Sequence, residues 1–266
     1  MTKSPDLTKR KKVGLALSGG GARGFAHVGV IKVLEKYNIK VDMVASTSMG
    51  SLVGAFYCAG MSVDRMIDAV ENATFLRIFD AGISVTGLSS TDKLKQYVES
   101  YIGTIDFNDL MTPLRVIATN IHAGKEEVIE SGKVSSAAIA SSALPGVLAN
   151  VRRGGKMLVD GGVMNILPVN RLLEKEMDYI IAVDTITNSI DQPIHSFAES
   201  ILRAFDIMQL PQIRTQSQLA SIVIRPDTIG LSPLEFTKKN NIACMERGEI
   251  AINSVIGTIL NDLKLN

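Results

Sequence analysis

Short apolar runs alternate along the chain with longer segments in which apolar residues recur at helical spacing. Runs bounded by glycine, proline or polar residues predict buried strands, here over Val13–Leu17, Val41–Ala45, Leu114–Ile121, Lys156–Val159, Tyr179–Val183 and Ser221–Ile224. The segments between them predict helices over Phe25–Tyr37, Met49–Ala59, Ser62–Ala73, Ser90–Tyr101, Ser135–Leu144, Pro168–Glu176, His195–Leu210 and Asn240–Leu263. Strands that alternate with helices form βαβ units, so we expect an α/β fold with a mainly parallel central sheet covered on both faces.

Two segments depart from this alternation. The turn His122–Lys125 separates a predicted strand from Glu127–Glu130, which predicts a hairpin. Phe75–Ser89 has no clear period, and we expect a loop or lid there. Because no internal repeat or low-complexity linker divides the chain, residues 1–266 are predicted to form a single domain, with residues 1–12 as a flexible N-terminal tail.

Composition and charge narrow the classes of function. The 266 residues are 46% hydrophobic and 21% charged, as in globular proteins, and the net charge is +1. The sequence has no basic stripe with interleaved aromatic residues, so nothing in it indicates a nucleic-acid partner. No run reaches the roughly 18 apolar residues of a membrane span, the N-terminus does not look like a signal sequence, and Cys58 and Cys244 fit a reducing compartment. We expect a cytoplasmic protein, with peripheral contact with the inner face of the membrane left open and the oligomeric state unknown.

The strongest candidate for a catalytic turn is Val44–Gly54. An apolar strand end, a bend at Ser48 and a helix start follow one another, as in a nucleophile elbow, usually written G-x-S-x-G. Ser46 stands where that pattern has its first glycine, and Gly50 provides the second. A helix start beneath Ser48 would offer unpaired N–H groups and a positive dipole end. Taken alone, the pattern also suits an ordinary strand-to-helix turn.

A glycine-rich loop follows the first predicted strand. Its glycines allow backbone conformations that other residues avoid, and their N–H groups can converge on a negative oxygen. That oxygen could belong to a phosphate or to a tetrahedral intermediate. The candidate oxyanion-hole residues are Gly19, Gly20, Gly21, Arg23 and Gly24.

The same loop satisfies G-x-G-x-x-G, so a dinucleotide-binding site has to be weighed. That fingerprint needs an acidic residue at the end of the second strand. Asp42 lies at the beginning of that strand instead, and Ala45 and Ser46 occupy its end. We therefore rank nucleotide binding well below an oxyanion hole.

Asp160 ends a predicted strand and is followed by Gly161 and Gly162, which let the backbone turn closely past a ligand. If its strand runs parallel to the first two, the glycine-rich loop, Ser48 and Asp160 all emerge at the carboxyl edge of the sheet, where open α/β sheets bind ligands. Asp160 could then act directly as the base that a serine nucleophile needs. A carboxylate that only caps its own turn is about equally well supported.

The three histidines offer no conventional base. His27 lies in the first turn of the first helix, His122 in the hairpin turn and His195 in a polar stretch. None follows an acid in the Ser–Asp–His order of α/β-hydrolases. The pattern leaves a dyad of Ser48 and Asp160 without histidine.

The motifs occur together in one order. In chain order the segments are GGGARG from Gly19, STSMG from Ser46, SSALPGV from Ser141, DGGVMNILP from Asp160, YIIAVD from Tyr179 and VIRPD from Val223. The combination resembles the patatin-like phospholipase family over about Val13 to Asn253, and is most similar to its short bacterial members.

This resemblance implies a three-layer α/β/α acyl-hydrolase fold, with Ser48 as nucleophile, Asp160 as base and Gly19–Gly21 as oxyanion hole. It also implies a glycerophospholipid or lysophospholipid as the substrate. Ser46 departs from the family's glycine, and we expect altered packing there rather than loss of the elbow.

The interpretation we favour is a serine acyl hydrolase that cleaves lipid esters through an acyl-enzyme, without a metal or other cofactor. Phe197–Met208 and Phe75–Ile83 could line an acyl-chain trough or hinge over it, although core packing or a subunit contact is the better supported role for the Phe197 face. Two other classes remain: a catalytically silent regulatory or scaffold member, and a nucleotide-binding protein that uses Gly19–Gly24.

Overall fold

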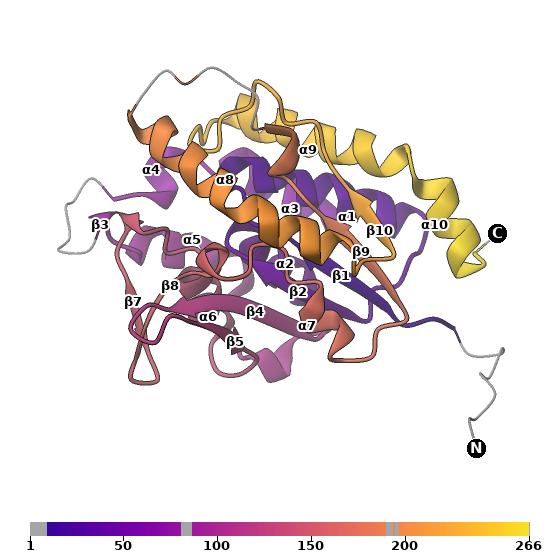
Figure 1. Ribbon diagram of the computed structural model, residues 1–266, viewed down its shortest axis with the longest axis horizontal. Coiled ribbons are helices and arrows are strands. Elements are labelled where there is room, and N and C mark those ends of the chain that lie inside the picture. Colours follow the sequence, from indigo (N-terminus) through magenta and orange to yellow (C-terminus); the bar gives the residue numbers. More distant parts are fainter. Residues whose placement is uncertain (1–9, 81–86, 190–193, 195–196, 266) are drawn as a thin grey trace.

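Parallel pairings build one half of the main sheet, as the strand pattern predicted. The computed structural model describes residues 10–80, 87–189, 194 and 197–265, and within them the strand order is β10-β9-β1-β2-β4-β8-β7, with β5 beside β4 (Figure 1). Neighbours from β10 to β4 are parallel, whereas β5, β7 and β8 pair antiparallel. The strands are β1 (Val13–Leu17), β2 (Met43–Thr47), β4 (Leu114–Asn120), β5 (Lys125–Ile129), β7 (Val151–Arg153), β8 (Lys156–Asp160), β9 (Tyr179–Val183) and β10 (Ile222–Ile224), and a separate pair joins β3 (Gly87–Ser89) to β6 (Gly146–Leu148).

Helices cover both faces of the sheet, which confirms the three-layer α/β/α architecture. In β1, Leu15 and Leu17 enter the larger core cluster, and Ala16 between them enters a smaller cluster on the opposite face. Figure 1 shows α7 and α8 in front of the sheet and α1 and α2 behind it. Burial on both faces explains why the strands are nearly continuous apolar runs. The helices are α1 (Ala26–Lys36), α2 (Met49–Cys58), α3 (Val63–Asn72), α4 (Phe75–Ile78), α5 (Asp92–Ile102), α6 (Val134–Ser141), α7 (Asn170–Leu173), α8 (Phe197–Ser217), α9 (Lys238–Asn253) and α10 (Ile256–Leu263), and the 3₁₀ turns are η1 (Gly21–Phe25), η2 (Phe107–Asp109), η3 (Gly161–Val163) and η4 (Thr187–Ser189).

Some predicted elements have different bounds. The helix expected over Pro168–Glu176 is limited to α7, and the one expected over Asn240–Leu263 is divided into α9 and α10. Phe75–Ser89, expected as a loop or lid, begins with α4 and ends with β3, and its residues 81–86 lie outside the described part of the chain.

The helix expected to end at Leu210 continues as α8 through Pro211 to Ser217. Pro211 lacks the N–H that would bond the carbonyl group of Ile207. Both residues lie on the exposed side of the helix, where water can supply that bond.

Part of the segment expected to be flexible is held against the folded chain. The first nine residues lie outside the described part, but Arg10 forms an ion pair with Asp42 at 2.5 Å. The N–H of Lys12 donates to Asp178 at 2.8 Å. The expected tail over residues 1–12 is therefore wrong for its last three residues.

β2 and β8 lie end to end along one side of β4, while β5 occupies the other side. On the shared side, Ile117 pairs with Thr47 at the end of β2, and the next residue, Ala118, pairs with Asp160 at the end of β8. The two strands run toward each other, so their carboxyl ends meet. The condition under which Asp160 was expected at this edge, a strand parallel to β1 and β2, is not met, because β8 is antiparallel to β4. The meeting of the strand ends still brings Asp160 to the predicted place.

The close crossing of α1 and α9 depends on two glycines. Helix α9 also packs against the glycine-rich loop. A Cβ on Gly248 would lie 1.9 Å from the carbonyl oxygen of Ala26, and one on Gly29 would lie 2.0 Å from that of Met245. Because these contacts are with backbone atoms, the helices would have to move apart to admit a methyl group.

We expect Gly248→Ala to lower the free energy of unfolding by about 1–3 kcal/mol, because overpacking forces the backbone to shift. Gly257→Ala on α10 is the matched control, since a Cβ there has no neighbour within 4 Å. Its effect should stay below about 1 kcal/mol in either direction. Urea unfolding of both variants measures the difference, and equal losses would contradict the close crossing as the cause.

Candidate active site

Ser48 directly follows the last residue of β2, at the carboxyl edge of the sheet, and has a strained backbone conformation. Its φ of 55° and ψ of −127° are rare for a residue with a side chain, and α2 begins directly after it. Gly50 permits this turn, because a Cβ there would lie 2.5 Å from the carbonyl oxygens of both Leu17 and Ser18. This is the geometry of a nucleophile elbow, in which the hydroxyl group projects from a sharp strand-to-helix turn.

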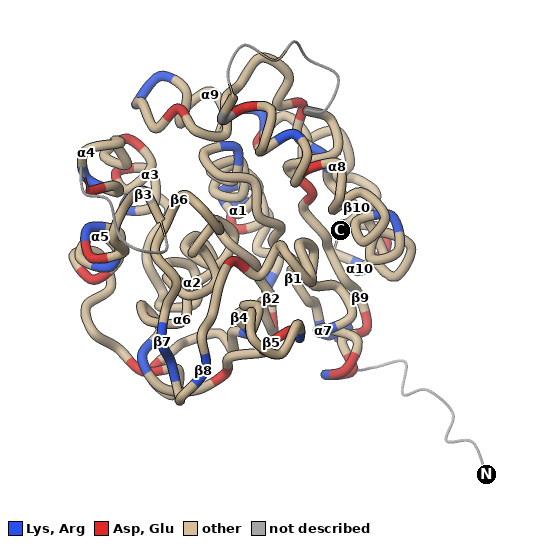
Figure 2. The backbone as a smooth tube through the Cα atoms, turned by 60° about the vertical axis from the view of Figure 1, so that its left-hand side comes forward, with Lys and Arg blue, Asp and Glu red and all other residues tan. Residues whose placement is uncertain are grey.

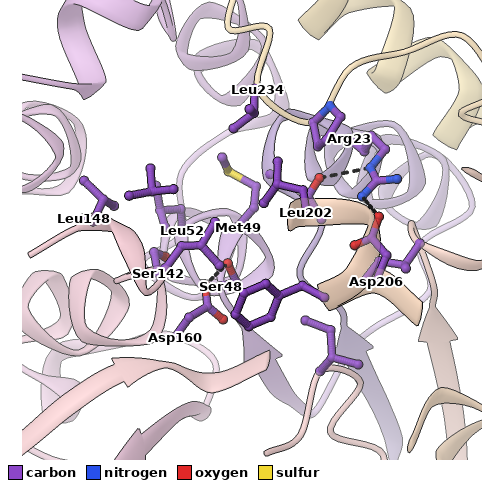
Figure 3. Close-up of a pocket in the computed structure, with 18 of the residues that line it drawn as sticks. Arg23, Ser48, Met49, Leu52, Ser142, Leu148, Asp160, Leu202, Asp206 and Leu234 are labelled. Carbon is purple, nitrogen blue, oxygen red and sulfur yellow. Dashed lines mark hydrogen bonds and ion pairs between the residues drawn. The ribbon is translucent and has the colours of Figure 1, made fainter. Parts of the chain in front are cut away.

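Asp160 contacts the Ser48 hydroxyl group directly. Ser48 Oγ donates to Asp160 Oδ2 at 2.6 Å, and Figure 3 shows the two side chains together in a pocket. Asp160 Oδ1 accepts the N–H of Gly162 at 2.7 Å, so the carboxylate also caps its own turn. Burial raises the pKa of Asp160 to about 6, while the bonds from Ser48 and Gly162 oppose that rise. The carboxylate is therefore mostly ionised at neutral pH and is a stronger base than an exposed aspartate.

Small residues allow the two strand ends to meet. A Cβ on Gly161 would lie 2.2 Å from the carbonyl oxygen of Ile117, so only glycine fits there. Ser46, which replaces the usual glycine of the elbow, is buried, and its Oγ lies 3.3 Å from the position that a Cβ on Gly54 would take. The absence of a side chain at Gly54 thus accommodates the Ser46 hydroxyl group, which also donates to the carbonyl oxygen of Arg115 at 3.4 Å.

The glycine-rich loop lies against Ser48. A Cβ on Gly19 would lie 3.0 Å from the Cβ of Ser48, but the N–H of Gly19 already donates to the carbonyl oxygen of Ile166 at 3.3 Å. Gly20 and Gly21, with φ values of 138° and 58°, line the pocket with Ser48. Among the described residues no hydrogen bond uses their N–H groups. Of the three glycines, Gly20 and Gly21 therefore keep an N–H group that could donate to a ligand in the pocket, whereas Gly19 does not.

Arg23 and Gly24 both make contacts that support the loop. Arg23 is buried, its Nε donates to the carbonyl oxygen of Gly20 at 3.3 Å, and its guanidinium group pairs with Asp206 on α8 at 2.8 Å (Figure 3). Gly24 leaves room for Met49, whose Cγ would lie 2.5 Å from a Cβ there. Both were predicted as oxyanion-hole residues. Their contacts give them a structural role in the loop, and Arg23 also lines the pocket with Ser48.

No histidine in the described part of the chain contacts Ser48 or Asp160. His27 is buried and its Nε2 donates to the carbonyl oxygen of Ser18 at 2.8 Å. Burial lowers the pKa of His27 to about 4, so the ring is neutral at pH 7. His122 is exposed in the hairpin turn, and His195 lies outside the described residues.

The alternatives that involve a cofactor gain no support from the geometry. Asp42, which a dinucleotide would need near the loop, accepts the N–H of Val13 at the opposite edge of the sheet and pairs with Arg10. The residues described contain no group of three His, Cys, Asp or Glu side chains placed to hold a metal ion.

Apolar side chains surround the pair (Figure 3). The two stretches predicted to line an acyl-chain trough both contribute, Phe75–Ile83 through α4 and Phe197–Met208 through α8. Phe197 and Met208 themselves are exposed to solvent. The apolar lining includes Leu52, Ile78, Phe79, Leu148, Leu202 and Phe205.

Three contacts at the site were not predicted. Asp206 on α8 forms an ion pair with Arg23. One turn later on the same helix, Gln209 donates to the carbonyl oxygen of Gly162 at 3.0 Å. Ser141 accepts the N–H of Ser48 at 2.8 Å. The segment SSALPGV was the available signal for Ser141, whereas no local pattern pairs residues of α8 with the two loops.

Comparison with known proteins finds one family model and several relatives that match this chain. The family model described as Patatin-like phospholipase matches residues 15–173. An uncharacterized NTE family protein of Mycobacterium tuberculosis is 34% identical over 174 residues, which are 65% of this chain and 48% of that protein. Lysophospholipase NTE1 of Debaryomyces hansenii is 32% identical over 184 residues, 67% of this chain and 12% of that protein.

Among solved structures, VipD of Legionella pneumophila has a TM-score of 0.54 at 14% identity, over 94% of this chain and 67% of VipD, which shows the likeness of fold. The chain spans about half the length of the mycobacterial relative.

We expect Asp160→Asn to stabilise the fold at pH 8. Because the pKa in the folded protein, about 6, exceeds the ordinary value of 3.8, the folded state binds the proton more tightly, and stability falls as the pH rises through this window. Asparagine removes the buried charge, so we expect a gain on the order of 1–3 kcal/mol at pH 8 that shrinks toward zero near pH 4. Urea unfolding at both pH values measures it, with Asp64→Asn on the exposed side of α3 as the control. A gain of equal size at both pH values would contradict the raised pKa.

Proposed function

Because the chain belongs to the patatin-like phospholipase family, we propose that it is a serine hydrolase that cleaves acyl ester bonds of phospholipids or lysophospholipids. Family membership supports lipid acyl hydrolysis as the class of reaction. The observation that carries the proposal is the 2.6 Å hydrogen bond from Ser48 Oγ to Asp160 Oδ2, made within an apolar pocket.

Acylation begins at Ser48. Asp160 takes the hydroxyl proton as Ser48 Oγ attacks the ester carbonyl carbon, and the carbonyl oxygen becomes negative. The N–H groups of Gly20 and Gly21 are the donors we assign to that oxyanion, because they line the pocket and that of Gly19 is already used. When the tetrahedral intermediate collapses, Asp160 returns the proton to the departing alcohol, which leaves an acyl group on Ser48.

Deacylation repeats these steps with water. Asp160 takes a proton from water, the resulting oxygen nucleophile attacks the acyl carbon, and the protonated Asp160 then returns the proton to Ser48. The same carboxylate can act in acylation and in deacylation, because it is ionised at neutral pH and can still hold a proton in each tetrahedral intermediate. Donors of this kind contribute about 3–4 kcal/mol each where they have been measured in other enzymes, so Gly20 and Gly21 would supply much of the rate.

The pocket favours a substrate with an acyl chain. Its apolar walls from α2, α4 and α8 can bury hydrocarbon next to Ser48, which is the main contribution to binding a lipid tail. Lysophospholipase NTE1 of Debaryomyces hansenii is a relative whose name states a lysophospholipid substrate. We assign the same substrate class, with a phospholipid as the alternative, to this chain.

The pocket is flanked by exposed apolar side chains on two helices. Along the outer side of α8, Phe197, Ile201, Ala204 and Met208 recur at helical spacing without a charge between them on that face; Phe197 is 82% and Met208 71% exposed. On α4, Leu76 is 76% exposed, only two residues before pocket-lining Ile78. Exposed apolar patches of this kind mark interaction sites.

We assign this surface to a lipid bilayer or micelle, because the proposed substrate resides there and the surface borders the pocket that would receive it. Lys and Arg are interspersed with Asp and Glu over the elements seen in Figure 2, which fits zwitterionic better than anionic lipid. None of the helices described is long and apolar enough to cross a membrane.

We expect Ser48→Ala and Asp160→Asn each to lower hydrolysis of a lysophospholipid at least about 1,000-fold, because the loss of nucleophile or base removes the covalent path. Ser48→Ala should also abolish labelling by a fluorophosphonate probe. The rate at which the unchanged protein is labelled should fall as the pH drops below about 6, where Asp160 becomes protonated.

Ser254→Ala is the control for these variants, since Ser254 is exposed at the end of α9. It should leave labelling and hydrolysis unchanged. A folded wild-type protein that neither labels nor hydrolyses any ester would refute the proposed hydrolase and favour a catalytically silent member.

We expect the double variant Phe197→Gln/Met208→Gln to bind phosphatidylcholine vesicles at least about tenfold more weakly than wild type, because two apolar contacts with the lipid are lost. Vesicle co-sedimentation measures the effect. Ile250→Gln on α9, where the side chain is 62% exposed, is the matched control and should bind as wild type does.

Hydrolysis of a water-soluble short-chain ester should be unaffected by the double variant. Equal binding by all three proteins would contradict the lipid contact. A dimer in solution that this variant dissociates would assign the surface to a second copy of the chain instead.

A further inference from the structure

The last residue of α6, Ser141, lies where the ends of β2 and β8 meet. Building on the proposed function, we infer that Ser141 is a positioning residue for the nucleophile, and that it holds the strained backbone of Ser48 in place through one hydroxyl group. The inference rests on three hydrogen bonds that converge on Ser141 Oγ.

The donor and the acceptor can be assigned in each of the three hydrogen bonds that Ser141 Oγ makes. Ser141 Oγ lies 2.5 Å from the carbonyl oxygen of Ile117, which can only accept, so Ser141 donates its single proton there. It then accepts the N–H of Ser48 at 2.8 Å. The contact with Ser51 Oγ at 2.9 Å must therefore use the proton of Ser51. Both acceptor sites and the one donor site of the hydroxyl group are occupied.

Two of these partners have no ready alternative. The N–H of Ser48 stands at the start of α2, where a helix leaves its N–H groups without intrahelical acceptors. The carbonyl group of Ile117 points toward Gly161, at the gap between the two strand ends. Ser141 is fully buried, so water cannot readily replace its hydroxyl group.

The contact bears on reactivity through the conformation of Ser48. A residue at φ 55° and ψ −127° persists only when its surroundings hold it there. The N–H bond to Ser141 and the Oγ bond to Asp160 fix the two ends of Ser48, so the loss of either lets the hydroxyl group move. Because its N–H is used in this way, Ser48 does not serve as an oxyanion donor.

The test is Ser141→Ala. We expect kcat for a short-chain ester and the rate of fluorophosphonate labelling to fall roughly 10- to 100-fold, since small displacements of a reacting group have effects of this size. KM should stay within about twofold, because Ser141 does not line the pocket. The Ser48 amide should exchange with solvent deuterium faster than in wild type, as measured by NMR.

Ser135→Ala is the matched control. Ser135 lies on the same helix, is equally buried and donates to Glu99 Oε1 at 2.8 Å, far from the catalytic pair. It should lower the melting temperature by a similar amount without changing kcat or Ser48 exchange. Ser141→Cys, which keeps a weaker donor and acceptor, should give intermediate rates and serves if the alanine variant does not fold.

An unchanged kcat in folded Ser141→Ala, or an equal loss in Ser135→Ala, would overturn the inference. If wild type itself neither labels nor hydrolyses, the proposed function fails, while Ser48 amide exchange still tests the hydrogen bond. Unchanged amide exchange in Ser141→Ala would then overturn the positioning role by itself.

Discussion

The end-to-end meeting of β2 and β8 on one edge of β4 is the constraint on which the site depends. Thr47 and Asp160 occupy consecutive positions along that edge, so the backbone ladder itself brings the residue after Thr47 to the carboxylate. The same junction excludes a side chain at Gly161 and leaves a gap that the Ser141 hydroxyl group fills. The proposed dyad needs its two groups at hydrogen-bond distance, and the ends of two paired strands set that distance.

α8 joins the two parts of the site that the strand ladder does not connect. Asp206 pairs with Arg23, which bonds the carbonyl group of Gly20, and Gln209 bonds that of Gly162 one turn later. A buried ion pair is weak evidence for net stability, but removal of one partner leaves a buried charge, so the pair fixes the helix against the loop. The helix whose outer face we assign to lipid therefore contacts both the loop of the proposed oxyanion donors and the turn that follows Asp160.

The sequence predicted most of this architecture and the proximity of Ser48 to Asp160, and the features it missed have a common cause. Apolar runs identified the described strands of the main sheet except β7, and they did not indicate the pair of β3 and β6. The order of the motifs pointed to Ser48 and Asp160. The direction of β8, the use of the Gly19 N–H by Ile166 and the partner of Arg23 depend on residues far away in the chain. Local periodicity carries no information about such contacts, and for the same reason it could not show that Gly24 is required by the packing of Met49.

An aspartate can replace histidine as the base only within a limited range of pKa. Near its ordinary value it is a weak base, and buried without partners it would stay protonated at neutral pH. Burial raises the pKa of Asp160 to about 6, and the bonds from Ser48 and Gly162 limit the rise. In the proposed mechanism, a bound acyl chain would exclude more water and raise this pKa further, and the N–H of Gly162 opposes that rise. The two glycines after Asp160 thus meet separate requirements: Gly161 allows the close approach of the Ile117 carbonyl group, and Gly162 supplies a hydrogen bond that lowers the pKa of the carboxylate.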